Sequence, residues 1–323
     1  MKQPTLSVII PAVNAGFTIE DCLSAIFAQT YSGEMDVVIA LGPSSDDTLE
    51  IVSKLAYSNK QLKVIENPSG LTPTALNLAI EATEGEIISR VDAHSVIPED
   101  YLEQAVSTLL RTKAANVGGI QHPVGFEGTQ RIIALAMRSS FGAGPANFRG
   151  HGDEGPTDTV YLGTFSRKIL EKIGGFDETL IRNQDYELNW RLRQAGYTVW
   201  FNPNLKVEYS PRPKLQQLAS QYFEYGSWKR RVLFKNPKSL KIRQLAAPTL
   251  LIGLFISSLM LITKNWCGLI VPTFYLVTLV FASFAIKESL KFKERIVLLL
   301  AFATMHLSWG IGFFFGKTKS KNG

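Results

Sequence analysis

Residues 6–29, LSVIIPAVNAGFTIEDCLSAIFAQ, join a short apolar run to an amphipathic segment. The run Leu6–Ile10 has no charged side chain and only five residues, which predicts a buried strand. From Thr18 to Gln29 apolar side chains recur at helical spacing. Those on one face are Ile19, Cys22, Leu23 and Ile26. The stretch therefore predicts one strand followed by one helix.

The same alternation continues to about Gly119. The expected strands are Asp36–Leu41, Leu62–Glu66 and Glu86–Val91. The expected helices are Asp46–Leu55, Thr72–Thr83 and Glu99–Arg111. Alternation of this kind predicts an α/β domain with a mostly parallel central sheet and crossover helices. Ligands of such sheets bind beyond the carboxyl ends of the strands, here just after residues 10, 41, 66 and 91.

Beyond Gly119 the pattern weakens. The stretch Gly142–Pro156 has five glycines and two prolines in 15 residues, which predicts a long loop without regular structure. Such a loop is either a lid over a site or a disordered connection. Residues 213–243 then form a basic amphipathic segment, expected at a membrane interface.

Charge is divided unevenly along the 323 residues. Residues 1–205 hold 16 basic and 24 acidic side chains, a net charge of −8. Residues 206–243 hold 10 basic and two acidic side chains, a net of +8, and residues 244–323 hold eight and two, a net of +6. An acidic front joined to a basic back excludes a nucleic-acid-binding protein with a basic surface throughout.

Three stretches near the C-terminus contain no Asp, Glu, Lys or Arg: 244–263, 265–286 and 296–316. Runs of about 20 apolar residues match the thickness of a bilayer core. Buried core helices are the other explanation, but three such runs within 80 residues favour a transmembrane region over 244–316. Residues 317–323 follow as a basic tail. We therefore expect a multi-pass protein of the cell membrane, with membrane lipids as partners.

The N-terminus and the cysteines narrow the class further. The apolar run after Pro4 is too short for a signal peptide, so residues 1–212 are expected to form a cytosolic domain. The two cysteines, Cys22 and Cys267, indicate neither a disulfide framework nor a zinc site.

Carboxylates follow the expected strand ends. Asp92 and His94 come directly after the strand Glu86–Val91, where both could hold a divalent metal on a diphosphate. Asp185 and Glu187 begin a helix that ends at Ala195-Gly196. The helix dipole explains carboxylates at that position and would keep their pKa low, as a general base requires.

Taken together, these segments resemble family 2 glycosyltransferases over roughly residues 5–210. The motifs that carry the likeness are Ser7-Val-Ile-Ile-Pro11 with Asn14, Gly42-x-Ser44-x-Asp46-x-Thr48, Asn67-Pro-x-Gly70, Ala75-x-Asn77, Asp92-Ala-His94, Phe176-Asp-Glu178 and Gln184-Asp185. Within that family the chain is most similar to membrane-anchored enzymes of exopolysaccharide assembly, of the succinoglycan-biosynthesis type. The closer likeness rests on Arg90–His94, Asp158–Tyr161 and Gln221–Lys229.

The resemblance implies a GT-A fold, a nucleotide-diphosphate sugar donor and inversion at the anomeric carbon. It also assigns roles to residues of this chain. Asp185 would be the catalytic base, and Asp92 and His94 would bind the metal. The donor would be bound by Pro11, Val13, Asn14, Gly70, Leu71, Asn77 and Asp92.

Four positions depart from the family pattern. Leu41 and Ala15 replace an aspartate and a glutamate, which removes polar contacts to the nucleotide base. Gln184 stands where a glutamate is usual, with Asp185 beside it retained. His94 stands where a second aspartate is typical, and because imidazole suits Mn²⁺ better than Mg²⁺, we expect Mn²⁺ to be favoured.

The membrane topology leaves a conflict. Seven Lys/Arg between Lys229 and Arg243, and four more between residues 287 and 295, place both segments on the cytosolic side. Three spans would then put the tail lysines 317, 319 and 321 outside, against that rule. Either one segment is re-entrant, with Pro248 and Pro272 as break points, or the tail tolerates the mismatch.

The expected function is transfer of one sugar from a nucleotide-diphosphate sugar to a lipid-linked or other glycan acceptor at the cytosolic membrane face. Processive synthesis is disfavoured because residues 217–228 lack a Gln-x-x-Arg-Trp motif. A non-catalytic, membrane-anchored scaffold of a glycan-assembly complex is the alternative, favoured by Leu41. A nicotinamide-dependent dehydrogenase is excluded because Pro11–Gly16 lacks Gly-x-Gly-x-x-Gly.

Overall fold

The computed structural model describes residues 3–150 and 152–316. The chain divides into two compact units. The first, here called the sheet unit, consists of Met1–His122 and Gly150–Tyr209. The second, the helical unit, consists of Pro123–Arg149 and Ser210–Gly323. Each unit is made of two stretches of chain that are separated in sequence.

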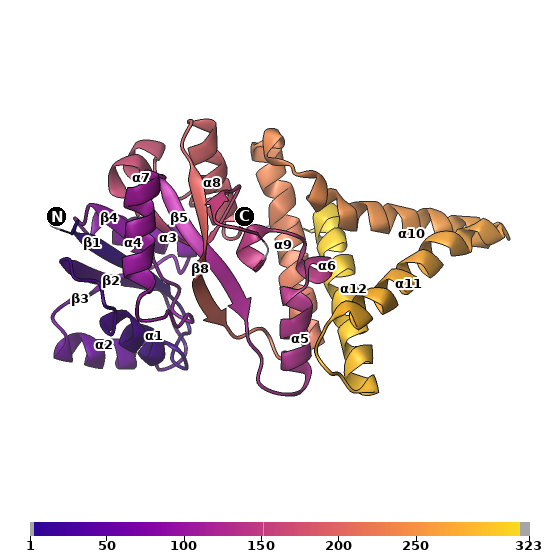
Figure 1. Ribbon diagram of the computed structural model, residues 1–323, viewed down its shortest axis with the longest axis horizontal. Helices are drawn as coiled ribbons and strands as arrows, with labels where there is room; N and C mark the ends of the chain where they lie inside the picture. Colours follow the sequence, from indigo (N-terminus) through magenta and orange to yellow (C-terminus); the bar gives the residue numbers. More distant parts are fainter. Residues whose placement is uncertain (1–2, 151, 317–323) are drawn as a thin grey trace. The chain divides into compact units, whose positions relative to one another are not determined.

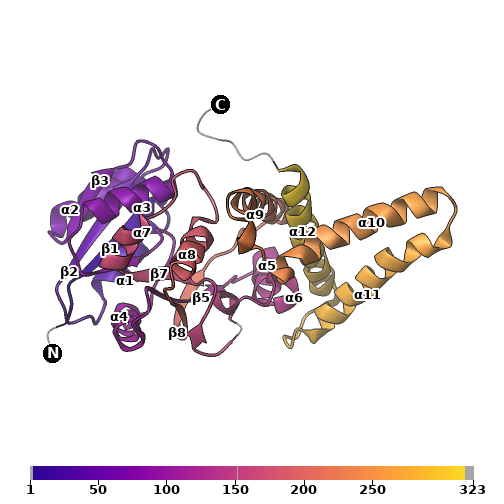
Figure 2. The same cartoon turned by 90° about the horizontal axis from the view of Figure 1, so that it is seen from above.

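One mixed eight-stranded sheet forms the centre of the sheet unit, with strand order β3-β2-β1-β4-β7-β5-β8-β6 (Figures 1 and 2). Its strands are β1 (Leu6–Ala12), β2 (Met35–Leu41), β3 (Leu62–Glu66), β4 (Ile87–Arg90), β5 (Asn116–Pro123), β6 (Gly155–Pro156), β7 (Tyr161–Ser166) and β8 (Val199–Tyr209). Neighbours from β3 to β4 are parallel, whereas the β4–β7, β7–β5 and β8–β6 pairs are antiparallel.

The parallel strands follow the sequence pattern closely. Each predicted strand there is found within one or two residues of its expected bounds. Along β1, alternate side chains enter opposite cores, because successive side chains of a strand point to opposite faces. Leu6, Val8 and Ile10 join one cluster and Ile9 the other. β1 is thus buried on both faces, as the unbroken apolar run requires.

Helices cover both faces of this sheet. The helices of the sheet unit are α1 (Ile19–Phe27), α2 (Thr48–Ser58), α3 (Thr72–Glu81), α4 (Tyr101–Thr112), α7 (Arg167–Ile173) and α8 (Gln184–Gln194). One core contains side chains of α1, α2 and α4, and the other contains side chains of α3, α7 and α8. Such a sheet covered on both sides confirms the predicted α/β class.

The helical unit contains the apolar C-terminal segments. Its helices are α5 (Gly128–Arg138), α6 (Ser140–Ala143), α9 (Leu215–Lys235), α10 (Ala246–Ile262), α11 (Ile270–Ala285) and α12 (Phe292–Phe315). Short 3₁₀ turns are η1 (Asn147–Arg149), η2 (Pro237–Ser239), η3 (Ile242–Leu245) and η4 (Trp266–Leu269). Three stretches are long and apolar enough to cross a membrane: Ile242–Ile262, Trp266–Ala285 and Phe292–Phe315.

Two expectations about loops and breaks were wrong. The glycine-rich stretch Gly142–Pro156 is not wholly irregular, since it contains the end of α6, η1 and the short strand β6. Pro248 and Pro272 do not break α10 and α11, because each lies in the first turn of its helix, where proline costs no hydrogen bond. The basic tail at 317–323 lies outside the described residues.

Candidate active site

The loops after β1 and β2 are tied together by side chains of the Gly42–Thr48 motif. Asn14 has a left-handed backbone (φ 49°), donates its N–H to Ser44 Oγ at 3.0 Å and accepts at Oδ1 from the Ser45 N–H at 2.8 Å. Asp46 Oδ2 accepts the Gly16 N–H at 2.9 Å. Hydrogen bonds from Thr48 and Gly16 lower the pKa of Asp46, so its carboxylate stays ionised and holds the loop.

A third loop, after β3, approaches the same place. A Cβ built on Gly42 would lie 2.5 Å from Val13 Cγ2 and 2.9 Å from Gly70 Cα, so only glycine fits between them. Gly70 itself has φ +63°, a conformation that other residues rarely adopt. Of the residues predicted to bind the donor, Pro11 lies near the end of β1, and Val13, Asn14, Gly70 and Leu71 lie on the adjoining segments that follow β1 and β3.

Leu41, which ends β2 beside these loops, is 8% exposed and belongs to the apolar core. It pairs in register with Ala12 and Glu66. The leucine therefore contributes to packing and offers no polar group to a ligand.

A buried arginine joins the two predicted catalytic segments. Arg90, the last residue of β4, has a side chain only 8% exposed. Its Nε donates to Asp92 Oδ1 at 2.8 Å, and its Nη1 donates to Asp185 Oδ1. Asp92 follows β4, and Asp185 lies in the first turn of α8, 93 residues later. The structure thus brings Asp92 and Asp185 to one cation at the strand end.

The two carboxylates differ in pKa. Burial would raise the pKa of Asp92, but the Arg90 guanidinium outweighs it and lowers that pKa below its usual value. Burial raises the pKa of Asp185, Arg90 opposes the rise, and the charge of Asp92 adds to it. The predicted low pKa of Asp185 was therefore wrong, because burial and the charge of Asp92 together exceed the opposing effect of Arg90. With 46% of its side chain exposed, Asp185 is still accessible to a substrate.

The turn that carries Asp92 and His94 is held from behind. Thr18 Oγ1 donates to the Ala93 carbonyl at 3.0 Å, and the Ser95 N–H donates to the Asp92 carbonyl at 2.9 Å. Ser95 Oγ and the Tyr161 hydroxyl lie 3.1 Å apart in a hydrogen bond. Cys22 packs under the same turn, and burial with the nearby Asp92 raises its thiol pKa to about 12, which makes it unreactive.

His94 itself is exposed, with its ring centroid 6.2 Å from that of Tyr209. Asp92 and His94 fit a divalent cation in chemistry: Asp92 is ionised, only its Oδ1 is occupied by Arg90, and His94 offers an imidazole two residues away. Among residues 3–150 and 152–316, no group of three or more His, Cys, Asp or Glu side chains could hold a metal. A cation bound at Asp92 and His94 would need further oxygen ligands, such as those of a diphosphate.

The structure gives Asn77 a positioning role. Its amide donates to the Phe176 carbonyl at 2.9 Å and to Glu178 Oε1 at 3.1 Å, and its oxygen accepts the Phe176 N–H at 2.9 Å. These bonds hold the Phe176–Glu178 turn, so a contact of Asn77 with the donor stays a prediction.

Glu187 also supports the site from within the protein. Its carboxylate, 2% exposed, accepts two bonds from Arg191 Nε, at 2.8 and 2.9 Å. Arg191 in turn donates to the carbonyls of Ile173 and Gly175 at 2.8 and 2.7 Å. The pair fixes α8, and therefore Asp185, to the turn before it.

Sequence reasoning missed the role of Arg90. The signal was present as one charged residue in the short strand-like run Ile87–Val91, since a buried charge requires a partner. The partner Asp185 could not be identified from spacing, because 95 residues separate the two.

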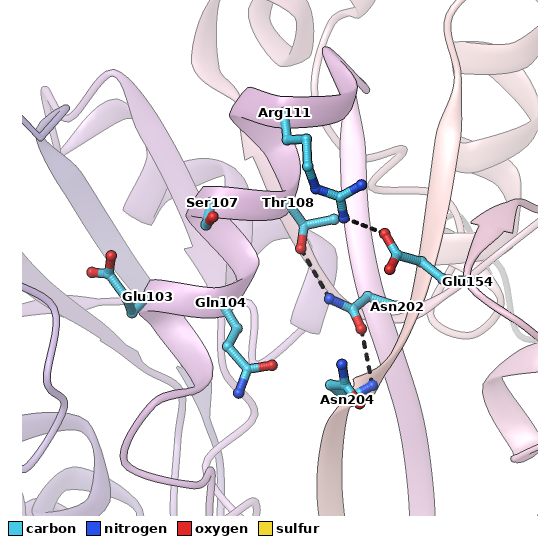
Figure 3. A pocket seen from close by; sticks show the side chains of 8 residues that line it. All are labelled: Glu103, Gln104, Ser107, Thr108, Arg111, Glu154, Asn202 and Asn204. Carbon is cyan, nitrogen blue, oxygen red and sulfur yellow. Dashed lines mark hydrogen bonds and ion pairs between the residues drawn. The ribbon is translucent and has the colours of Figure 1, made fainter. Parts of the chain in front are cut away.

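Apart from these residues, a polar pocket of about 260 Å³ lies between α4 and β8 (Figure 3). It is lined by Glu103, Gln104, Ser107, Thr108, Arg111, Glu154, Asn202 and Asn204. Asn202 Nδ2 donates to Thr108 Oγ1 at 2.9 Å, and Arg111 pairs with Glu154. None of the predicted site residues lines this pocket.

A sheet of this topology, with adjoining loops after β1, β2 and β3 and with Asp92 and Asp185 both bound to Arg90, is of the GT-A type. The family model for "Glycosyl transferase family 2" matches residues 7–174, more than half of the chain. The chain therefore belongs to glycosyltransferase family 2 and is a glycosyltransferase.

Two curated relatives extend the likeness beyond the sheet unit. The "Succinoglycan biosynthesis protein ExoA" of Rhizobium meliloti (strain 1021) is 29% identical over 310 residues, which cover 95% of this chain and 93% of the relative. A "Dolichyl N-acetyl-alpha-D-glucosaminyl phosphate 3-beta-D-2,3-diacetamido-2,3-dideoxy-beta-D-glucuronosyltransferase" of Methanococcus voltae is 28% identical over 233 residues, covering 69% and 72%.

Among solved structures, a mannosyltransferase from Pyrobaculum calidifontis, in complex with GDP-Man and Mn²⁺, superposes with a TM-score of 0.63. The match covers 98% of this chain and 89% of that one at 19% sequence identity. At that identity the likeness confirms the fold. The residues that act in this chain have to be argued from its own geometry.

Proposed function

We propose that this protein is an inverting glycosyltransferase that moves one sugar from a nucleotide-diphosphate sugar to a lipid-linked glycan acceptor, at the cytosolic face of the membrane. The observation that carries the proposal is the Arg90 bridge, which holds Asp92 and Asp185 at one strand end. Its setting supports the proposal, because the nucleotide loops predicted from the resemblance adjoin at the same sheet edge.

Each residue of the site has its own role in a single displacement at the anomeric carbon. Asp185 accepts the proton of the acceptor hydroxyl while that oxygen bonds to the anomeric carbon. The carbon–oxygen bond to the diphosphate breaks on the opposite side, so the configuration inverts. Arg90 opposes the rise in the Asp185 pKa and so favours the ionised form, which a base requires. Pro11, Val13, Asn14, Gly70 and Leu71 hold the nucleoside part of the donor.

Asp92 and His94 would hold a divalent metal, and Asp92 would also contact the donor through it. When bound, the metal neutralises negative charge on the diphosphate. The Pyrobaculum calidifontis structure, which contains GDP-Man and Mn²⁺, supports a metal-dependent donor site in this fold.

The acceptor proposal rests on the helical unit and the relatives. Three helices are long and apolar enough to cross a bilayer, so a membrane-bound acceptor would lie near the protein. One relative is named for succinoglycan biosynthesis and another for a dolichyl-linked sugar phosphate. We therefore place this protein in exopolysaccharide or cell-surface glycan synthesis.

The test is donor binding and metal-dependent hydrolysis over a panel of nucleotide sugars, with Asp185→Asn compared with Asp21→Asn. Both aspartates lie in the first turn of a helix, but Asp21 of α1 is exposed and lies outside the cluster. We expect Asp185→Asn to bind the donor and lose at least about 100-fold in rate, since general-base catalysis contributes about 10²–10⁴-fold. Transfer at the parental rate would remove Asp185 from its role. No donor binding by the parent at any metal concentration would favour the scaffold alternative.

The metal preference is tested separately. Because His94 offers nitrogen, turnover with Mn²⁺ should exceed turnover with Mg²⁺. The His94→Asp variant should show a smaller difference between the turnover rates with Mn²⁺ and Mg²⁺, since carboxylate oxygen suits Mg²⁺. Equal rates at saturating concentrations of either metal in the parent would contradict the preference.

A further inference from the structure

The three apolar helices of the helical unit differ in how far the protein covers them. Of the most apolar window in each, 11% is buried for Ile242–Ile262, 22% for Trp266–Ala285 and 33% for Phe292–Phe315. The first two expose large side chains along their length, including Phe255, Ile262, Phe274 and Phe281. α12 is covered the most, and the elements that cover it show where it lies.

The C-terminal half of α12 packs directly on α9. A Cβ on Gly226 of α9 would lie 2.0 Å from the Trp309 carbonyl oxygen, and one on Gly312 would lie 2.0 Å from the Phe223 carbonyl oxygen. The pairs 223/312 and 226/309 show that the backbones of the two helices nearly touch. They lie side by side in both views (Figures 1 and 2).

The end of α12 is capped by the same helix. Arg230 of α9 donates to the carbonyl oxygens of Phe314 and Gly316, at the end of α12. The last carbonyl groups of a helix need partners from outside it. α9 is a polar helix on its other side, where Gln216, Gln217 and Glu224 are exposed. If α12 crossed the bilayer, α9 would carry these side chains into hydrocarbon, which is costly.

The N-terminal half of α12 packs on α5 and α6. Arg131 of α5 pairs with Glu294 at 2.7 Å, and Phe141 of α6 meets the Phe302 ring with centroids 5.1 Å apart. His306 Nε2 donates to the Phe141 carbonyl at 2.7 Å. α12 therefore has protein contacts at its beginning, middle and end.

Chain connectivity places both covering elements on the side of the sheet unit. Four residues link β5, which ends at Pro123, to α5, and five link β8, which ends at Tyr209, to α9. Links of this length reach at most about 13–18 Å, less than the roughly 30 Å of a bilayer core. The beginnings of α5, near Arg131, and of α9 therefore lie on that side. The exposed polar side chains of α9 keep the rest of that helix, with Arg230, out of the hydrocarbon core.

We propose that α12 does not cross the membrane. It lies along the membrane surface, with its covered side on α5, α6 and α9 and its exposed apolar side chains in lipid, whereas α10 and α11 are the only two crossings among the described residues. This inference rests on the membrane attachment that is part of the proposed function, and it specifies the membrane topology of the protein. α10 and α11 run away from α12 and meet at the turn that joins them (Figures 1 and 2).

The charge distribution agrees with two crossings. From Ile242 to Ile262 the helical stretch of 21 residues is long enough, at about 31 Å, to span the core. The turn between α10 and α11 then lies on the membrane side opposite the sheet unit. It holds one lysine, Lys264, close to Trp266, a residue type typical of the membrane interface. With two crossings, the basic segments 229–243 and 287–295 both lie on the side of the sheet unit, and the sequence that carries the tail lysines follows a helix that does not cross. The conflict with the positive-inside rule therefore disappears.

Cysteine accessibility in intact cells tests this topology. One reporter is the native Cys267 in the α10–α11 turn, which is exposed. Three more are placed one at a time in a Cys22→Ser, Cys267→Ser background: Ser53→Cys in α2, Ser289→Cys before α12, and Ser320→Cys, which lies outside the described residues. Ser53 and Ser289 are exposed. A membrane-impermeant maleimide is applied to spheroplasts before and after lysis.

We expect Cys267 to react in intact spheroplasts and the reporters at 53, 289 and 320 to react only after lysis. Reaction at 320 on the side of Cys267 would overturn the proposal, as three spans predict. Protection of Cys267 until lysis together with the reporters at 53, 289 and 320 would overturn the two crossings, because all four positions would then lie on one side. If 53, 289 and 320 all react in intact cells and Cys267 only after lysis, the topology holds and the proposed cytosolic orientation fails. A chain absent from the carbonate-washed membrane fraction would instead overturn the attachment itself.

Discussion

Each unit of the molecule contains an arginine that joins two carboxylates, and the two clusters differ in burial. In the sheet unit Arg90, 8% exposed, binds Asp92 and Asp185. In the helical unit Arg131, 31% exposed, pairs with Glu288 at 3.2 Å and Glu294 at 2.7 Å. Both clusters connect residues that are far apart in sequence.

Burial gives the same chemistry two different uses. Around Arg131 water screens the charges, so the pairs contribute little free energy and chiefly select one arrangement of α5 against α12. Around Arg90 the surroundings lower the pKa of Asp92 and raise that of Asp185. Two carboxylates whose pKa values are pushed apart suit the separate roles that we propose for them. A buried ion cluster at a strand end is therefore evidence for a site, and a half-exposed one is not.

Arg90→Met should have the largest effect, because it leaves two carboxylates at the strand end without their cation. We expect the free energy of unfolding of the sheet unit to fall by about 3–5 kcal/mol. Sugar transfer should fall by at least about 100-fold. Denaturant unfolding and transfer assays measure the two quantities. Arg111→Met is the matched control, since Arg111 pairs with Glu154 at 57% exposure. Equal losses in the two variants would contradict the comparison.

Arg90→Lys sharpens the same comparison. An ammonium group keeps the charge but cannot donate from two fixed nitrogens to Asp92 and Asp185 at once. We expect the free energy of unfolding to fall by about half as much as in Arg90→Met. The rate of sugar transfer should still fall by about tenfold. Full activity in the lysine variant would show that charge alone matters at this position and that the bridging geometry does not.

The two halves of the sheet show what the sequence could predict. Strands β1 to β4 are encoded locally, because runs such as Leu6–Ile10 are apolar on both faces and separated by helices with one apolar face. β7 and β8 carry polar residues such as Thr164, Asn202 and Asn204, and their partners are antiparallel and distant in sequence. Local periodicity does not identify such strands.

The site shows the same limit. Asp92, His94 and Asp185 could be selected because each occurs at the end of a predicted strand or the start of a predicted helix. The contacts of Asn77 and Glu187 within the protein could not be predicted, since their partners, the Phe176–Glu178 turn and Arg191, depend on tertiary packing and side-chain direction. The topology conflict also needed the structure, because apolar length alone makes α12 resemble α10 and α11.

Tyr161→Phe tests a neutral contact within the buried site. Burial raises the pKa of Tyr161 well above its usual value, so its hydroxyl stays protonated and pairs with Ser95 at 3.1 Å. Removing the hydroxyl should lower the free energy of unfolding by about 0.5–1.5 kcal/mol, less than the loss of Arg90. Tyr57→Phe is the control, because Tyr57 is 95% exposed and should change nothing measurable. If Tyr161→Phe lowered the free energy of unfolding as much as Arg90→Met, the ion pairs of Arg90 would stabilise the site no more than one neutral hydrogen bond does.

The smallest effect is expected at the Arg131–Glu294 pair of the helical unit. A double-mutant cycle with Arg131→Gln and Glu294→Gln, measured by thermal unfolding of the detergent-solubilised protein, should give an interaction of about 0.2–1 kcal/mol. It should weaken between low and high salt, because at 31% and 30% exposure both side chains are in contact with water. An interaction above about 2 kcal/mol that does not change with salt would show that lipid shields this pair. In that case exposure to water would not be what separates the two arginine clusters, and α12 would lie deeper in the membrane than its contacts with α5 and α9 imply.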